Sequence, residues 1–262
     1  MTQTVHRFID HDGVRLCLER RGNGPQHVLF VHGWISSRRM WYDVADKLDP
    51  QRYTLHLLDF RGCGLSDRPP EGHSLGGYAA DLRAALRSVE APVALVGHSM
   101  GARVAQFVAI DRPANLQRMI LVAPGIAGSM KPNEKQRALA LGAFGSRERI
   151  EQFQRAAMGR AVAYEPMERI VDDALICQRE AWFTSFDELR ALDFSAQLQH
   201  IAVPVMAIAG AKDPLAPPSR VKRDVASAIP GCVFLMLREA GHNLPVETPD
   251  EIAGAVERFA VG

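Results

Sequence analysis

Short apolar runs alternate with amphipathic stretches along most of this chain, and that alternation restricts the folds open to it. Runs of strand length, several rich in β-branched residues, lie at 14–18, 27–31, 53–58, 93–96, 119–122, 205–209 and 233–237. Between most of them, apolar residues recur at helical spacing, at 40–48, 75–88, 102–110, 219–228 and 249–259. Strand and helix in turn predict an α/β fold, in which right-handed crossovers build a parallel sheet with helices on both faces.

Two regions depart from the alternation. The stretch HRFIDHDGVRLCLER predicts an antiparallel hairpin at the leading edge of the sheet, with its turn at His11-Asp12-Gly13. Residues 125–198 show no convincing strand, but carry apolar residues at helical spacing. We therefore predict a helical cap over 125–198, inserted after the sixth strand of a core formed by 1–124 and 199–262. Because ligands of open parallel sheets bind beyond the carboxyl ends of the strands, this cap would roof the binding crevice.

Charge and composition limit the partners that this chain is expected to have. The 31 basic and 30 acidic residues give a formal net charge of +1, so no net field would attract nucleic acid or anionic lipid. No apolar run approaches the roughly 20 residues that span a bilayer, and the N-terminus lacks a signal-peptide pattern. We expect a cytoplasmic protein that binds small molecules. The cysteines lack CxxC spacing and are expected to be reduced: Cys17, Cys63, Cys177 and Cys232.

The stretch VALVGHSMGARVAQFVA, residues 93–109, contains a candidate nucleophile. It passes from an apolar run, through two glycines around Ser99, into a helical pattern. A sharp strand-to-helix turn with a nucleophile at its apex strains the backbone and needs small residues two positions to either side, here Gly97 and Gly101. GxSxG alone is a short pattern with many chance matches. Its place between a strand and a helix makes Ser99 a serious candidate.

A nucleophilic serine needs a base and an acid that orients the base. His242 follows the last strand-like run in REAGHNLPVETPDEI, and Asp213 follows the preceding one in AIAGAKDPLAPP. Either residue alone could be an ordinary turn or loop residue. Both, however, stand at carboxyl ends of predicted strands, and the chain order is Ser, Asp, His. Together with Ser99 they predict a catalytic triad.

Two backbone N–H groups are candidates for an oxyanion hole. Met100 begins the helix after Ser99, where free N–H groups and the positive end of the helix dipole favour an anionic intermediate. Trp34 lies in the loop after the strand-like run 27–31 and would supply the second N–H. In the predicted cap, Trp182, Phe183 and Phe186 lie within about one helical turn of each other. They could pack the cap against the core or line a substrate pocket.

Several other polar residues near these motifs are expected to be structural. Asp59 and Arg61 would hold a glycine-rich turn through side-chain hydrogen bonds, and Cys63 would act as a small apolar filler. His32 and His98 are expected to pack behind the reacting groups. The histidines show no HExxH or close paired spacing, so we expect no metal site.

Taken together, these motifs resemble those of the α/β-hydrolase-fold serine hydrolases. The matching stretches are HGW at 32–34, DFRGCGLS at 59–66, GHSMG at 97–101, and further on GAKDPLAP and AGHNLPVETP. The resemblance implies an eight-stranded, mostly parallel sheet, a helical cap and no cofactor. It also implies Ser99 as nucleophile, Asp213 as acid, His242 as base, and the N–H groups of Trp34 and Met100 as oxyanion donors. Epoxide hydrolases and haloalkane dehalogenases carry aspartate at the elbow, so Ser99 argues against both.

The expected reaction is hydrolysis of a small carboxylic ester through an acyl-enzyme. Three alternatives stay open. Carbon–carbon bond hydrolases use the same triad but typically carry Asn where His98 stands, and cofactor-free perhydrolases share the serine elbow. Some members of the superfamily are small-molecule receptors with vestigial hydrolysis. The Arg-rich cap could also dock an acidic carrier protein, although alternating Glu residues favour a solvated helix face.

Overall fold

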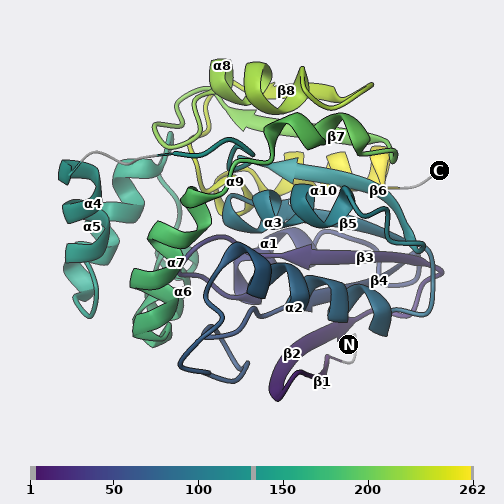
Figure 1. Ribbon diagram of the computed structural model, residues 1–262, viewed down its shortest axis with the longest axis horizontal. Coiled ribbons are helices and arrows are strands. Elements are labelled where there is room, and N and C mark those ends of the chain that lie inside the picture. The colour runs from purple at the N-terminus through teal and green to yellow at the C-terminus, as the bar shows by residue number, and fades with distance from the viewer. Residues whose placement is uncertain (1–3, 131–133, 261–262) are drawn as a thin grey trace.

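The sheet predicted from the apolar runs is present in the computed structural model, which describes residues 4–130 and 134–260 (Figure 1). Its strands are β1 (Val5–His11), β2 (Val14–Arg21), β3 (Gln26–Val31), β4 (Tyr53–Leu58), β5 (Val93–His98), β6 (Leu116–Val122), β7 (Val205–Gly210) and β8 (Val233–Leu237). The order across the sheet is β1-β2-β4-β3-β5-β6-β7-β8. β1 and β2 are antiparallel to each other, β2 is antiparallel to β4, and the remaining pairs are parallel. The expected eight-stranded, mostly parallel sheet is confirmed.

The predicted hairpin forms the edge of this sheet. His11 pairs with Val14, and between them Asp12 and Gly13 adopt φ values of 48° and 75°. Two successive residues with positive φ make the tight turn that matches the twist of antiparallel strands, and Asp-Gly is a preferred pair for it. The local sequence therefore accounts for the register of β1 on β2.

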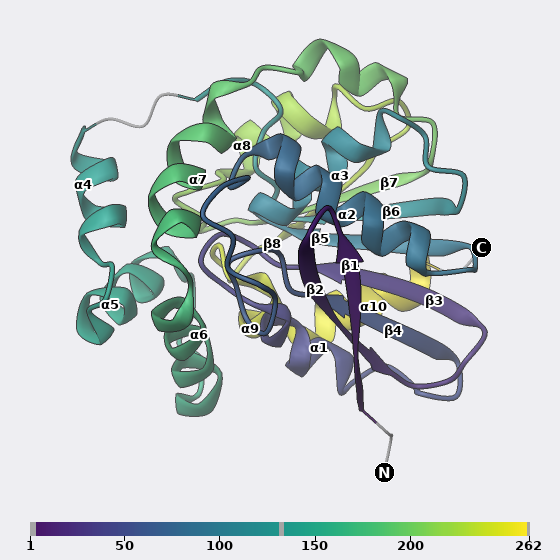
Figure 2. The same cartoon turned by 60° about the horizontal axis from the view of Figure 1, so that its bottom comes forward.

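Helices cover both faces of the sheet, as Figures 1 and 2 show. The core helices are α1 (Tyr42–Ala45), α2 (Leu75–Ser88), α3 (Met100–Ala109), α8 (Pro218–Val221), α9 (Leu244–Glu247) and α10 (Pro249–Phe259). Short helices of other types lie at Arg38–Trp41, Ser195–His200 and Lys222–Ala226. The predictions for 75–88 and 249–259 agree with α2 and α10. The predicted helix at 40–48 is instead a 3₁₀ turn followed by a single α-helical turn, and that at 219–228 is α8 continued by a π-helix.

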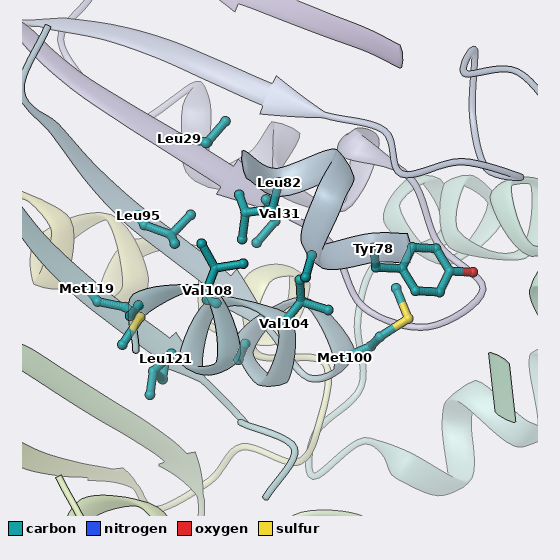
Figure 3. Packing of buried hydrophobic residues seen from close by; sticks show 14 of the residues in the cluster. Leu29, Val31, Tyr78, Leu82, Leu95, Met100, Val104, Val108, Met119 and Leu121 are labelled. Carbon is teal, nitrogen blue, oxygen red and sulfur yellow. The ribbon is translucent and has the colours of Figure 1, made fainter. Parts of the chain in front are cut away.

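Alternate residues of the central strands face two separate cores. Leu29 and Val31 of β3 belong to the core under α2 and α3, where Val104 and Val108 of α3 pack (Figure 3). Val28 and Phe30 of the same strand lie in the core on the opposite face. Burying a Val, Leu or Phe side chain contributes about 1.5–3 kcal/mol. This packing fixes α3, and with it the turn that leads into α3 from β5.

The insertion between β6 and β7 is helical, as expected. It contains α4 (Glu134–Gly142), α5 (Arg147–Ala157), α6 (Tyr164–Ile176) and α7 (Arg179–Ala191), which lie together at one end of the sheet in Figure 1. Residues 131–133 of the predicted cap lie outside the described residues. The chain leaves the helical conformation between α6 and α7, where the Gln178 N–H donates to the carbonyl of Gly62 in the core, at 2.8 Å.

All the cysteines are free thiols, which agrees with the sequence expectation. Cys63, in the loop after β4, and Cys177, at the break between α6 and α7, are buried with their Sγ atoms 3.4 Å apart. The two thiols therefore fill one contact between core and cap. Within residues 4–130 and 134–260, no helix has the length and apolar character needed to cross a membrane.

Candidate active site

Ser99 stands at the apex of the turn between β5 and α3. Its backbone has φ 49° and ψ −109°, a conformation that is strained for any residue with a side chain. The neighbouring chain leaves no room for side chains at the two flanking glycines. A Cβ at Gly97 would lie 2.8 Å from Ala102 Cα, and one at Gly101 would lie 2.4 Å from the carbonyl oxygen of His32. The glycine spacing around Ser99 is therefore a steric requirement of this turn.

Ser99, His242 and Asp213 form one chain of hydrogen bonds. The distance from Ser99 Oγ to His242 Nε2 is 2.9 Å, and that from His242 Nδ1 to Asp213 Oδ2 is 2.8 Å. Because an ionised carboxylate can only accept, Nδ1 carries the proton and Nε2 is left to accept from the serine hydroxyl. The loops after β5, β7 and β8 thus bring together residues that are far apart in the sequence.

Asp213 is held by its own loop. Its Oδ1 accepts from the N–H groups of Leu215 and Ala216, at 2.7 and 2.9 Å. Burial by itself would raise the pKa of Asp213, but the charge of His242 and the hydrogen bonds from His242, Ala216 and Leu215 more than offset burial. The pKa of this carboxyl lies below its ordinary value, so the group is ionised at neutral pH and keeps the imidazole in one tautomer.

The backbone of His242 is fixed on both sides. Its N–H donates to the carbonyl of Ala157 at 2.7 Å, and its carbonyl accepts from His98 Nε2 at 2.9 Å. Burial, together with the nearby His242 ring, lowers the pKa of His98 to about 3. His98 is therefore neutral at physiological pH, and its remaining ring nitrogen Nδ1 has no partner among the described residues. The expectation that His98 packs behind the reacting groups agrees with this placement.

Glu247, at the end of α9, carries no signal in the sequence beyond its place in the stretch after His242. Its buried carboxylate accepts from the N–H groups of Gly241 and Asn243, which flank His242, at 2.8 and 2.9 Å. It also accepts from the N–H groups of Gly159 and Arg160, just beyond α5, at 2.8 and 3.2 Å. One carboxylate therefore ties the loop of His242 to the end of a cap helix.

The two predicted oxyanion donors, Trp34 and Met100, line a cavity together with Ser99. Met100 is the first residue of α3, so its N–H has no acceptor within the helix. Trp34 follows β3, and its N–H makes no hydrogen bond within the described part of the chain. Behind this loop, His32 donates from Nδ1 to the Gly33 carbonyl and accepts from the Phe60 N–H at Nε2, at 2.8 and 3.1 Å. His32 is thus a structural residue, as expected.

A cavity of about 420 Å³ opens over Ser99 between core and cap. Among the described residues, its wall includes Phe186 but neither Trp182 nor Phe183, so of the two roles that the sequence left open, packing of the cap fits those two. Trp182 is fully buried, packs edge-on against Trp34 and donates from Nε1 to the Ala174 carbonyl. Phe183 packs edge-on against Phe144. The wall instead carries Phe153 of α5, which sequence reasoning did not single out.

The loop after β4 is built around buried ion pairs. Asp59 accepts from the N–H groups of Arg38 and Leu65, at 2.7 and 2.9 Å, and it also pairs with the Arg38 guanidinium. Arg61 pairs with Asp81 of α2, with Nη2 2.5 Å from Oδ1. These contacts agree with the structural roles expected of Asp59 and Arg61. No group of three or more potential metal ligands is found in the described ranges.

The family follows from a sequence comparison. Residues 28–255 match the profile of the Alpha/beta hydrolase family. The chain belongs to this family. Its eight-stranded sheet, its serine elbow after β5 and its helical insertion are those of an alpha/beta hydrolase, so the expected resemblance is confirmed.

Full-length relatives of this alpha/beta hydrolase are similar at modest identity. It is 24% identical to the AB hydrolase superfamily protein YisY of Bacillus subtilis, over 97% of this chain and 98% of that protein. It is 27% identical to the pimeloyl-[acyl-carrier protein] methyl ester esterase of Aeromonas hydrophila, over 92% of this chain and 98% of that one. The esterase EaEST from Exiguobacterium antarcticum shares the fold, with a TM-score of 0.90 at 20% identity, covering 98% of this chain and 100% of that chain.

Proposed function

We propose that this alpha/beta hydrolase is a serine esterase that cleaves a small carboxylic ester through an acyl-enzyme. The observation that carries the proposal is the hydrogen-bond chain from Ser99 Oγ through His242 to Asp213, with distances of 2.9 and 2.8 Å. Ser99 and His242 both reach the 420 Å³ cavity, which is large enough for a small ester. A strained serine at a cavity, with a base and an orienting acid in reach, is the arrangement that acyl transfer requires.

The proposed reaction uses groups that are already in place. His242 Nε2 accepts the Ser99 proton as Oγ attacks the ester carbonyl, and Asp213 stabilises the imidazolium that forms. The N–H groups of Trp34 and Met100 would bind the oxyanion; each such donor contributes about 2.7–4 kcal/mol in enzymes of this kind. His242 then passes the proton to the leaving alcohol, and water repeats the cycle on the acyl-enzyme.

The relative with a methyl ester esterase name acts on a substrate attached to an acyl-carrier protein. On this chain, several arginines of the cap are already paired with carboxylates of the cap. Arg137 pairs with Asp187 and Arg155 with Glu151, both at 2.6 Å. An acidic carrier would find little unpaired charge at these positions. We therefore propose that the substrate is a free small molecule.

The test is replacement of the nucleophile. Ser99→Ala is expected to lower the rate of hydrolysis of short methyl or p-nitrophenyl esters at least about ten-thousand-fold, because the attacking hydroxyl is gone. Phosphonate labelling of the protein, followed by mass spectrometry, should be lost with it. Ser129→Ala is the matched control, since Ser129 lines the same cavity and takes no part in the proposed chemistry.

Two results would contradict the proposal. Full ester hydrolysis by the Ser99→Ala variant would remove Ser99 from the mechanism. If a dienedioate-type substrate of carbon–carbon hydrolases were turned over faster than any simple ester, the triad would stand but the reaction would be carbon–carbon bond hydrolysis.

A further inference from the structure

Basic but no acidic side chains are found among the described residues that line the cavity over Ser99. Arg103, Arg190 and Arg220 lie on its wall, and no Asp or Glu is among the described residues that line it. The chain as a whole has a formal net charge of only +1, so this imbalance is local to the cavity. Two of the arginines, Arg103 and Arg190, lie close enough for their charges to interact, and they carry the inference.

Arg103 lies on α3 one helical turn after Ser99, and its N–H donates to the Ser99 carbonyl at 3.0 Å. Arg103 as a residue is 2% exposed. The guanidinium donates to the carbonyls of Gly128 and Leu192, at 3.1 and 2.5 Å, and its Nε has no hydrogen-bond partner in the described part of the chain. Burial, and then the charge of Arg190, lowers the pKa of Arg103 to about 10. The group is still a cation at neutral pH.

Arg190 reaches the same region from the last turn of α7, two residues before Leu192. Its guanidinium lies over the ring of Phe186, 3.9 Å from the centroid, and donates to the Phe186 carbonyl. Burial lowers the pKa of Arg190 to about 10 as well, so it too is charged at neutral pH. Two buried cations that repel each other are costly unless an anion offsets them.

The carboxylates that face these arginines are engaged elsewhere. Asp187 accepts two hydrogen bonds from Arg137, at 3.1 and 2.6 Å. Asp193 accepts from the N–H and the hydroxyl of Ser195, at 2.9 and 2.7 Å. Within the described ranges, neither Arg103 nor Arg190 forms an ion pair of 4.0 Å or less with a carboxylate. Asp193 and Asp187 offset these two charges only in part and from a distance, and within the described ranges no carboxylate contacts either guanidinium directly.

We propose that Arg103 and Arg190 bind a carboxylate of the substrate, so that the substrate is an ester that also carries a free carboxylate, such as a monoester of a short dicarboxylic acid. This inference rests on the proposed esterase function for the ester end of the molecule. Guanidinium groups match a planar carboxylate in geometry and charge. Arg103, Arg190 and Ser99 all line the same cavity, so a molecule bound there could reach the serine with its ester and the arginines with its carboxylate.

The apolar part of the wall fits the rest of such a molecule. Phe153, Phe186 and Leu189 line the same cavity and would contact the methylene chain between the ester and the carboxylate. These apolar side chains would bury the methylene chain of the substrate, and the two arginines would bind its carboxylate. A neutral ester of equal length would gain the apolar contacts but would leave both cations without a counter-ion.

The test compares two esters of equal chain length, methyl hydrogen glutarate and methyl pentanoate. The wild-type protein is expected to hydrolyse the charged ester with a kcat/KM about tenfold higher or more, as for a hydrogen bond to a charged group. Arg190→Gln should remove that preference, and the Tm of the variant without ligand shows that it folds. Arg190→Lys retains a cation and should keep part of the preference.

Arg179→Gln is the matched control. Arg179 is on the same helix, over the ring of Phe183, and is not on the wall of the cavity as described. This variant should keep both rates. Equal kcat/KM values for the two esters in the wild-type protein, or an unchanged preference in Arg190→Gln, would overturn the carboxylate site while leaving the proposed esterase intact.

A binding measurement separates the two proposals. Glutarate should raise the Tm of the wild-type protein and not that of Arg190→Gln, whether or not any ester is cleaved. If no ester is hydrolysed but this Arg190-dependent shift is present, the proposed function fails and the carboxylate site stands. A shift with inorganic phosphate and none with glutarate would overturn the assignment to a carboxylate.

Discussion

Ser99 presents its hydroxyl to the cavity through a backbone conformation that serine rarely adopts. The surrounding chain holds it there: the Ser99 N–H donates to the Val122 carbonyl at 2.9 Å, and its carbonyl accepts from the N–H groups of Arg103 and Gly125, at 3.0 and 3.1 Å. Backbone strain of this kind costs about 1–3 kcal/mol and persists only where neighbouring contacts impose it. The strain should therefore be measurable as lost stability.

Replacing Ser99 by glycine or by alanine separates strain from chemistry. Both variants lose the nucleophile, but glycine adopts a φ of 49° without the clash that a Cβ causes. We expect Ser99→Gly to be more stable than Ser99→Ala by about 1 kcal/mol, after allowing for the greater freedom of glycine in the unfolded chain. Urea denaturation of the two variants measures the difference. An alanine variant of equal or greater stability would show that the turn is relaxed.

The meeting of Ser99, Asp213 and His242 could be predicted from sequence, since each follows a strand and parallel strands end at one edge of the sheet. The aromatic residues of the cap could not be placed in the same way. Helical spacing says which residues share a face of α7, but not how that face is turned towards the cavity. In the structure, Phe186 lies on the wall of the cavity, whereas Trp182 is buried beside Trp34. The places of Asp213 and His242, by contrast, could be predicted from the order of the strands alone.

At the scale of elements, Glu247 joins the loop of His242 to the end of α5. Its carboxylate is the acceptor for backbone N–H groups from both segments. A buried carboxylate with several such donors is strongly bound, and removing it would leave those N–H groups without an acceptor. The position of the His242 ring therefore depends on a side chain outside the proposed triad.

Glu247→Ala is expected to lower kcat at least about tenfold and to destabilise the fold by about 2–4 kcal/mol, because several buried donors lose their acceptor. Glu251→Ala is the control; Glu251 is exposed on α10 and lies 4.0 Å from Arg160. Ester hydrolysis rates and denaturation curves of both variants measure the effect. A Glu247→Ala variant with wild-type kcat would mean that the loop holds His242 unaided.

Most elements could be predicted because buried residues are apolar, and their spacing along the sequence differs between strands and helices. β4, β8, α2 and α10 agree with the apolar patterns at 53–58, 233–237, 75–88 and 249–259. Breaks within helices could not be predicted where a distant contact decides them. At the separation of α6 from α7, the Gln178 N–H donates to the Gly62 carbonyl of a loop more than a hundred residues earlier. No local pattern encodes that contact.

At the scale of the whole molecule, buried histidines make stability depend on pH. Burial lowers the pKa of both His56 and His98 from 6.5 to about 3; for His56, the charges of His27, Arg20 and Arg7 add to the effect. In the unfolded chain these imidazoles take up protons below about pH 6.5, whereas in the folded chain they do so only near pH 3. Their contribution to stability is complete above pH 6.5 and declines as the pH falls towards 3.

We expect the free energy of unfolding to decrease between pH 7 and pH 5, a range above that in which most carboxylates titrate. Asp173 acts in the opposite sense, because burial raises its pKa to about 6, but it opposes two histidines. His56→Gln should lose less stability than the wild type over this range. Urea denaturation at both pH values gives the comparison. An identical loss in the two proteins would show that His56 does not contribute.

Ala157, whose carbonyl accepts from the His242 N–H at 2.7 Å, is the last residue of α5, so the cap itself holds part of the His242 backbone. A cap that lifted at this point to admit a molecule would withdraw the acceptor and release one restraint on the base. Closure of the cap over a substrate and positioning of His242 beside Ser99 would then occur together.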